Sequence, residues 1–134
     1  HPGGNIGAKF ITVKEIMHKV PNVPLANEKT NMKSIILKIS QKGFGCVGIV
    51  NNKKCLVGII TDGDLRRNMG ADILNKNAQE VMIKSPKTIF KNRYIKEALE
   101  IFNKEKITVL FVLNNSSSKV PIGIIHLHDC FPNY

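Results

Sequence analysis

Two short motifs in this 134-residue sequence carry side chains suited to binding an anionic, hydroxylated small molecule. The first, at residues 58–64, reads Gly-Ile-Ile-Thr-Asp-Gly-Asp, and Arg66 and Arg67 follow it. Its first glycine would let a ligand approach the backbone, the Thr61 hydroxyl can donate to a phosphate or sugar oxygen, and the Asp64 carboxylate can accept from two vicinal hydroxyls. A strand that turns into a helix after Thr61 would aim backbone N–H groups at an anion. The two arginines could form ion pairs with the same anion. Thr61 or Asp64 could instead simply cap that helix, and the two roles can coexist.

The second motif, at residues 123–129, reads Gly-Ile-Ile-His-Leu-His-Asp, with His126 where the first motif has threonine. If the strand continues, His126 and His128 point to the same side, a spacing that a metal ion could use together with Asp129. No fourth ligand is evident, so we predict no metal. His126 is expected either to donate to a ligand or to pack at a domain interface. A histidine that faces the ligand would make binding sensitive to pH near neutrality.

Both motifs close one copy of an internal repeat. Met17 and Met82 are 65 positions apart, as are Asp64 and Asp129, so each methionine precedes its aspartate by 47 positions. The middle of the repeat has a slightly different offset, because the polar loop after residue 113 is longer than the one after residue 50. An insertion in a polar loop has a small energetic cost.

Each copy predicts one amphipathic helix between extended segments. Apolar side chains recur at i, i+3, i+4 and i+7 from Met32 and again from Ile95, which is the spacing of one helix face. Thr30 or Asn31 is expected to cap the first helix and Asn92 the second.

Short β-branched runs predict two strand pairs, and a closing helix is expected after each pair. The strands are expected at residues 46–50, 55–61, 109–113 and 120–126, and Gly43 and Gly45 should end the first helix. A unit of about 60 residues is marginally stable alone, so the two copies should bury their sheets against each other. Residues 1–10, with three glycines and Pro2, are typical of a linker.

The β-α-β-β-α repeat, with a Met-led start and a Gly-h-h-Thr-x-x-Asp ending (h, hydrophobic), resembles the CBS domain over residues 11–131. The resemblance implies an α+β fold, a tandem CBS pair (Bateman module) with pseudo-two-fold symmetry. CBS domain 1 would occupy residues 11–74 and CBS domain 2 residues 75–134. The resemblance also implies a set of ligand-binding residues: Gly58, Ile60, Thr61, Asp62, Asp64, Arg66, Arg67, Thr88, Ile89, His126, His128 and Asp129.

Four ordered segments further resemble the arabinose 5-phosphate isomerases of the KpsF/GutQ-like family. They lie at residues 1–7, 16–18, 61–67 and 126–129. That family joins an N-terminal sugar isomerase domain to two CBS domains and interconverts ribulose 5-phosphate and arabinose 5-phosphate, towards Kdo of lipopolysaccharide and capsules. The sugar isomerase domain is absent from this sequence, which we expect to be a fragment or a processed chain. His1 matches a linker histidine that the family places in its active site, but no acid/base pair with a phosphate anchor appears here, so we expect no catalysis.

Charge and cysteine content limit the other functions. The net charge of +10 is spread as +6 over residues 1–72 and +4 over residues 73–134, which favours a solvated surface over a nucleic-acid footprint. Cys46, Cys55 and Cys130 form no C-x-x-C pair, so reduced cytoplasmic thiols are expected. No apolar run approaches the roughly 20 residues of a membrane span, and no secretory signal is visible.

The leading hypothesis is therefore a regulatory module that needs no cofactor and senses an anionic nucleotide or nucleotide-sugar. Feedback logic favours CMP-Kdo as the ligand, whereas most CBS pairs would suggest AMP or ATP. Occupancy would be transmitted to the protein's own sugar isomerase domain. The alternative is a purely structural role, in which the pair forms a homodimer and helps to build a tetrameric enzyme without any ligand.

Overall fold

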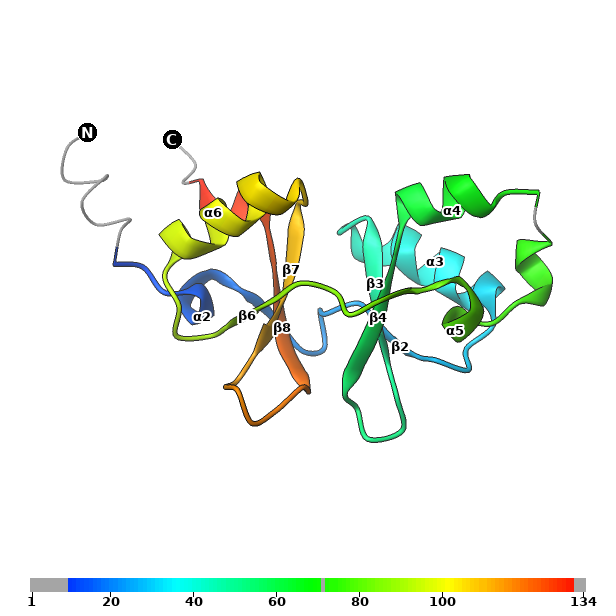
Figure 1. Cartoon of the computed structure of the whole chain (residues 1–134), viewed down its shortest axis with the longest axis horizontal. Helices are drawn as coiled ribbons and strands as arrows, with labels where there is room; N and C mark the ends of the chain where they lie inside the picture. The colour runs from blue at the N-terminus through cyan, green and yellow to red at the C-terminus, as the bar shows by residue number, and fades with distance from the viewer. Residues whose placement is uncertain (1–9, 71, 132–134) are drawn as a thin grey trace. The chain divides into compact units, whose positions relative to one another are not determined.

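The computed structural model describes residues 10–70 and 72–131, which fold as two compact units (Figure 1). The middle unit lies within residues 21–86, and the flanking unit combines residues from 1–20 with residues from 87–134. The predicted linker, His1 included, lies outside the described residues apart from Phe10. The units cut across the sequence repeats, because the start of the first repeat folds with the flanking unit and the start of the second repeat folds with the middle unit.

The middle unit is built on a four-stranded sheet in the order β2-β3-β4-β5. β2 runs parallel to β3, whereas β3 with β4 and β4 with β5 are antiparallel. The strands are β2 (Leu25–Asn27), β3 (Cys46–Val50), β4 (Leu56–Thr61) and β5 (Ile83–Lys84). The helical segments are α3 (Met32–Lys42), α4 (Asp62–Asn68), the 3-10 turn η1 (Ile73–Asn75) and α5 (Ala78–Val81). The apolar face of α3 packs with the sheet residues Val47, Ile49 and Ile60 in one buried cluster.

The flanking unit has the same plan, with the sheet order β1-β8-β7-β6. β6 runs parallel to β7, and β8 is antiparallel to both of its neighbours. The strands are β1 (His18–Lys19), β6 (Thr88–Phe90), β7 (Val109–Leu113) and β8 (Pro121–His126). The helical segments are α2 (Val13–Ile16), α6 (Ile95–Glu105) and the 3-10 turn η2 (Leu127–Cys130). A second buried cluster joins α6 to Leu110, Val112 and Ile125.

Two methionine–glycine contacts join the start of each repeat to the sheet of the unit in which it folds. A Cβ atom added at Gly58 would lie 2.4 Å from Sδ of Met82, and one added at Gly123 would lie 2.5 Å from Sδ of Met17. Met82 directly precedes β5, which pairs with β4, the strand that contains Gly58. Met17 directly precedes β1, which pairs with β8, the strand that contains Gly123. Met82 thus fills the space that the missing side chain of Gly58 leaves open.

Most predicted elements are confirmed, with small shifts at the ends. β3 and β7 match residues 46–50 and 109–113, while β4 and β8 each begin one residue later than expected. Asn31 caps α3 by accepting a bond from the Ser34 N–H at 3.0 Å, and Gly43 ends that helix with a positive φ of 79°.

Two local predictions in the second repeat are wrong. The cap of α6 is Tyr94 rather than Asn92, because the Glu97 carboxylate accepts from the Tyr94 N–H at 2.9 Å and residues 11 and 12 hold this segment by backbone contacts. The expected closing helix is, within the described residues, only the 3-10 turn η2. The sequence continues with Pro132, which lacks the N–H that a helix needs.

Candidate functional site

The first motif forms the turn between β4 and α4 in the middle unit. Thr61 has extended backbone angles and caps α4, where its Oγ1 accepts from the Asp64 N–H at 3.2 Å. In return, Oδ2 of Asp64 accepts from the Thr61 N–H at 2.9 Å and from its hydroxyl at 3.0 Å. This reciprocal capping box satisfies backbone donors that a helix start leaves without partners. The capping role considered for Thr61 and Asp64 is therefore present.

Asp64 is the only buried charged residue in the described part of the chain, with 3% of its surface exposed. Its second carboxylate oxygen pairs with the guanidinium of Arg67, whose side chain is 70% exposed. The Asp64 carboxylate is thus held by three donors from the protein itself, and a ligand hydroxyl would have to share or replace one of them. Of the Asp64–Arg67 ion pair, the Arg67 side chain is the exposed partner.

The remaining predicted residues of the first motif differ in accessibility. Asp62 and Arg66 are exposed, whereas Ile60 is fully buried in the core cluster of the middle unit. Ile60 therefore contributes to the core of the middle unit in this structure. Gly58 is covered by Met82.

The second motif forms the corresponding turn between β8 and η2 in the flanking unit. Oδ2 of Asp129 accepts from the His126 N–H at 2.8 Å, as Asp64 does from Thr61. The His126 ring takes the place of the threonine hydroxyl, since its Nδ1 accepts from the His128 N–H at 3.0 Å. The two imidazole rings stack, with centroids 4.8 Å apart and planes 14° from parallel. His126 and His128 do lie together, but through a turn rather than through strand alternation.

His18 completes this group, and the sequence analysis missed it. Its Nε2 lies 3.1 Å from each carboxylate oxygen of Asp129, so it occupies the role that Arg67 has beside Asp64. The repeat offset of 65 pairs His18 with Ile83, so the repeat itself contained no signal for a side chain at this position that binds Asp129. Only the antiparallel pairing of β1 with β8 brings His18 to Asp129.

Within residues 10–70 and 72–131, no group of three or more His, Cys, Asp or Glu side chains is arranged to hold a metal ion. Burial, reinforced by the nearby His128 and His18, lowers the pKa of His126, although the charge of Asp129 acts in the opposite direction. The neutral form of His126 is therefore favoured, as its acceptor role requires.

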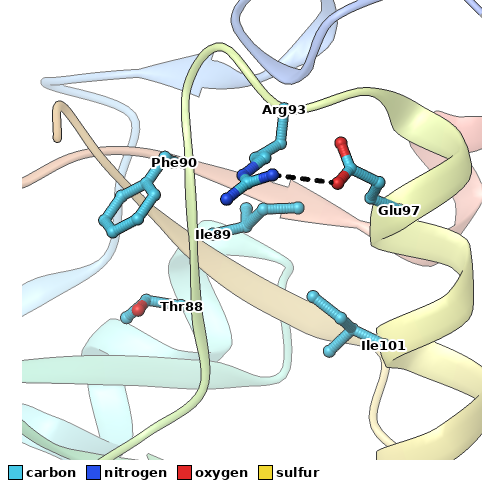
Figure 2. Close-up of a pocket in the computed structure, with 6 residues that line it drawn as sticks. All are labelled: Thr88, Ile89, Phe90, Arg93, Glu97 and Ile101. Carbon is cyan, nitrogen blue, oxygen red and sulfur yellow. Dashed lines mark hydrogen bonds and ion pairs between the residues drawn. The ribbon is translucent and has the colours of Figure 1, made fainter. Parts of the chain in front are cut away.

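Thr88 and Ile89 lie elsewhere in the flanking unit, on the strand β6. With Phe90, Arg93, Glu97 and Ile101 they line a cavity of about 330 Å³ between β6 and α6 (Figure 2). A 3.2 Å ion pair joins Arg93 to Glu97 at one end of β6, and another of 3.2 Å joins Lys87 to Glu105 at the other end. Neither His126 nor Asp129 lines this cavity.

All three cysteines are free thiols, and Cys46 is the most protected of them. It is 1% exposed, and burial, together with the negative charge of Asp62, raises the pKa of its thiol to about 12. Alkylation requires the thiolate, so Cys46 should resist iodoacetamide at about pH 8 in the folded protein. Peptide mapping by mass spectrometry measures this against the same protein in urea. Equal labelling rates in the two states would show that Cys46 is accessible in the folded chain.

Comparison with known proteins identifies the family. The model of the CBS domain matches residues 13–71 and again residues 78–132. This chain belongs to the CBS domain family. The tandem CBS prediction is thereby confirmed, and the two matches follow the sequence repeats rather than the two compact units.

The curated relatives of this CBS pair are longer proteins. The arabinose 5-phosphate isomerase KdsD of Francisella tularensis is 40% identical over 132 residues, which cover 96% of this chain and 39% of the relative. The KdsD of Yersinia pestis is 31% identical over the same length and share of each chain. The uncharacterized protein RP505 of Rickettsia prowazekii is 38% identical over 129 residues, again 96% of this chain and 40% of the relative. The CBS pair thus spans about two fifths of the length of these proteins.

Solved structures show the same fold at lower identity. The crystal structure of CBSX2 in complex with AMP has a TM-score of 0.76 at 19% identity, covering 90% of this chain and 92% of the other. The CBS pair of protein MJ0100 in complex with 5′-methylthioadenosine and S-adenosyl-L-methionine has a TM-score of 0.78 at 20% identity, with the same coverage.

None of the helices in the described part of the chain is long and apolar enough to cross a membrane.

Proposed function

We propose that this CBS pair is the non-catalytic, ligand-sensing part of an arabinose 5-phosphate isomerase. The observation that carries the proposal is the 40% identity to a KdsD across almost the whole chain. The parent would interconvert ribulose 5-phosphate and arabinose 5-phosphate, and its sugar isomerase domain would be the partner that responds to ligand occupancy.

The ligand that we favour is an adenine nucleotide. AMP and S-adenosyl-L-methionine, named with two structures of this fold, share an adenosine group, which offers vicinal ribose hydroxyls to an aspartate. In the middle unit, the exposed Arg67 beside Asp64 supplies a cation for the phosphate. The net charge of +10 also favours an anionic ligand. CMP-Kdo, the product-feedback candidate, has no comparable support and is retained as a competitor.

A thermal-shift screen with AMP, ADP, ATP, CMP, CMP-Kdo and arabinose 5-phosphate tests the proposal. A ligand at 100 times its Kd stabilises the folded state by about 2.7 kcal/mol, which corresponds to a shift of several degrees in Tm for a domain of this size. A shift with an adenine nucleotide that Arg67→Ala reduces supports the proposal, and a matched Lys96→Ala variant, on the exposed side of α6, should leave the shift intact.

A structural role in assembly is the second candidate. In the middle unit, Leu37 on α3, Met69 after α4 and Leu74 in η1 are 61%, 75% and 51% exposed. Such side chains favour burial against another protein surface, such as a second CBS pair in a homodimer that helps to build a tetrameric parent. Light scattering of wild type and Leu37→Lys tests this role. A change from dimer to monomer, with no ligand shift in the screen, would favour assembly over sensing.

A further inference from the structure

Three histidines and one aspartate form a titratable group in the flanking unit, which we call the histidine cluster: His18, His126, His128 and Asp129. Two of its hydrogen bonds fix the turn after β8. The His126 N–H donates to Asp129, and the His128 N–H donates to Nδ1 of His126. The cluster does for η2 what Thr61 and Asp64 do for α4.

The two turns differ in one chemical respect. The Thr61 hydroxyl accepts the Asp64 N–H at any physiological pH, because a hydroxyl does not titrate there. An imidazole nitrogen accepts a hydrogen bond only while it carries no proton. Because the donor to Nδ1 of His126 is a backbone N–H, the capping bond requires the tautomer with its proton on Nε2.

The charges around His126 act mainly in one direction. On η2, His128 disfavours the protonated form and Asp129 favours it, and His18 on β1 disfavours it as well. Cys130 contributes only a weak Sγ–H donor to the His126 carbonyl, at 3.9 Å. β7 places the apolar Val109 opposite His126, and α6 contributes apolar side chains such as Phe102 to the cluster beneath η2. Burial is the largest of the effects that lower the pKa of His126.

We propose that His126 is an acid-sensitive cap: protonation of its Nδ1 breaks the bond from the His128 N–H and releases the turn that carries Asp129. The proton comes from solvent, and no other bond is made or broken. Nε2 of His18 lies 3.1 Å from both carboxylate oxygens of Asp129, so a second side chain holds this carboxylate. Acid therefore weakens the turn after β8 in the flanking unit, while the Thr61 turn stays unchanged.

The direction of the stability change follows from the lowered pKa. The unfolded chain binds the proton more readily than the folded chain, so the cap contributes fully above the unfolded value of about 6.5 and loses its contribution as the pH falls towards the lower folded value. If Asp129 contacts a ligand, which rests on the proposed function, binding through the flanking unit weakens over the same range.

NMR of the ligand-free wild-type protein between about pH 8 and about pH 5 tests the proposal directly. We expect the His128 amide to shift, and to lose hydrogen-exchange protection, with the same midpoint as the His126 ring. The hydrogen-exchange protection of the His128 amide should fall about tenfold for each pKa unit by which folding lowers the pKa of His126. The Asp64 amide, bonded to Thr61, is the internal control and should not move.

The variant His126→Thr builds the middle unit's cap into the flanking unit and should remove the fall in Tm on acidification. If it does not fold, His126→Asn supplies another capping residue that does not titrate. A His128 amide that stays unchanged while the His126 ring titrates would overturn the proposal, as would an undiminished pH dependence in either variant. Since no ligand is present, these outcomes leave the sensing proposal to its own test.

Discussion

Gly123→Ala should lower the free energy of unfolding by about 1–3 kcal/mol, the usual effect of adding a methyl group to a filled site. The new Cβ would lie 2.5 Å from Sδ of Met17 and 2.9 Å from the backbone carbonyl oxygen of His18. A methionine side chain can move, but the carbonyl belongs to β1, which pairs with β8 in register at this position. Urea unfolding monitored by circular dichroism measures the change.

Gly58→Ala is the matched comparison, because its three nearest contacts are all side-chain atoms of Met82. It should destabilise the protein less, and Met82→Ala in the same chain should relieve most of the clash. Met17→Ala should relieve Gly123→Ala only in part, because the His18 carbonyl remains. Full additivity in both double-mutant cycles would contradict the proposed contacts.

Asp64→Ala should also lower the free energy of unfolding by about 1–3 kcal/mol. The substitution leaves the part-buried Thr61 N–H without its acceptor and removes the ion-pair partner of Arg67. The loss of the ion pair itself contributes little, because Arg67 is 70% exposed and water solvates its charge. Thermal and urea unfolding of Asp64→Ala, compared with wild type, give the size of the effect.

Asp129→Ala is the matched variant in the flanking unit and should have a smaller effect. The Asp129 side chain is 23% exposed, against 4% for Asp64, so water can replace more of its contacts. Equal stability of Asp64→Ala and wild type would contradict the capping role that we assign to Asp64. It would leave ligand contact as the reason for an aspartate at this position.

The local elements could be predicted from the sequence because their signals are local. The β-branched runs and the polar turns after Val50 and Leu113 define the strands, and the helical spacing from Met32 defines α3. The start of α6 could not be predicted in this way. Asn92 has the better capping side chain, but backbone contacts from residues 11 and 12 fix the helix start at Tyr94.

The candidate site was only partly predictable for a related reason. The residues of both motifs are adjacent in sequence, so the grouping of Thr61 with Asp64 and of His126 with Asp129 followed from spacing. His18 lies 111 positions before Asp129, and their pairing depends on which sheet the first repeat start joins. Neither the repeat period nor the composition shows which sheet a repeat start joins. The start of the second repeat joins the sheet of the middle unit in the same way, which places Met82 against Gly58.

Isothermal titration calorimetry with AMP tests the central claim, that this CBS pair senses a nucleotide, most directly. The account predicts saturable binding to the wild-type chain, with affinity reduced at least about tenfold in Asp64→Asn, which keeps the shape of the cap but loses a charged acceptor for the ribose hydroxyls. The absence of saturable heat with AMP, and equally with ATP and CMP-Kdo, would contradict the sensing function and favour a role in assembly alone.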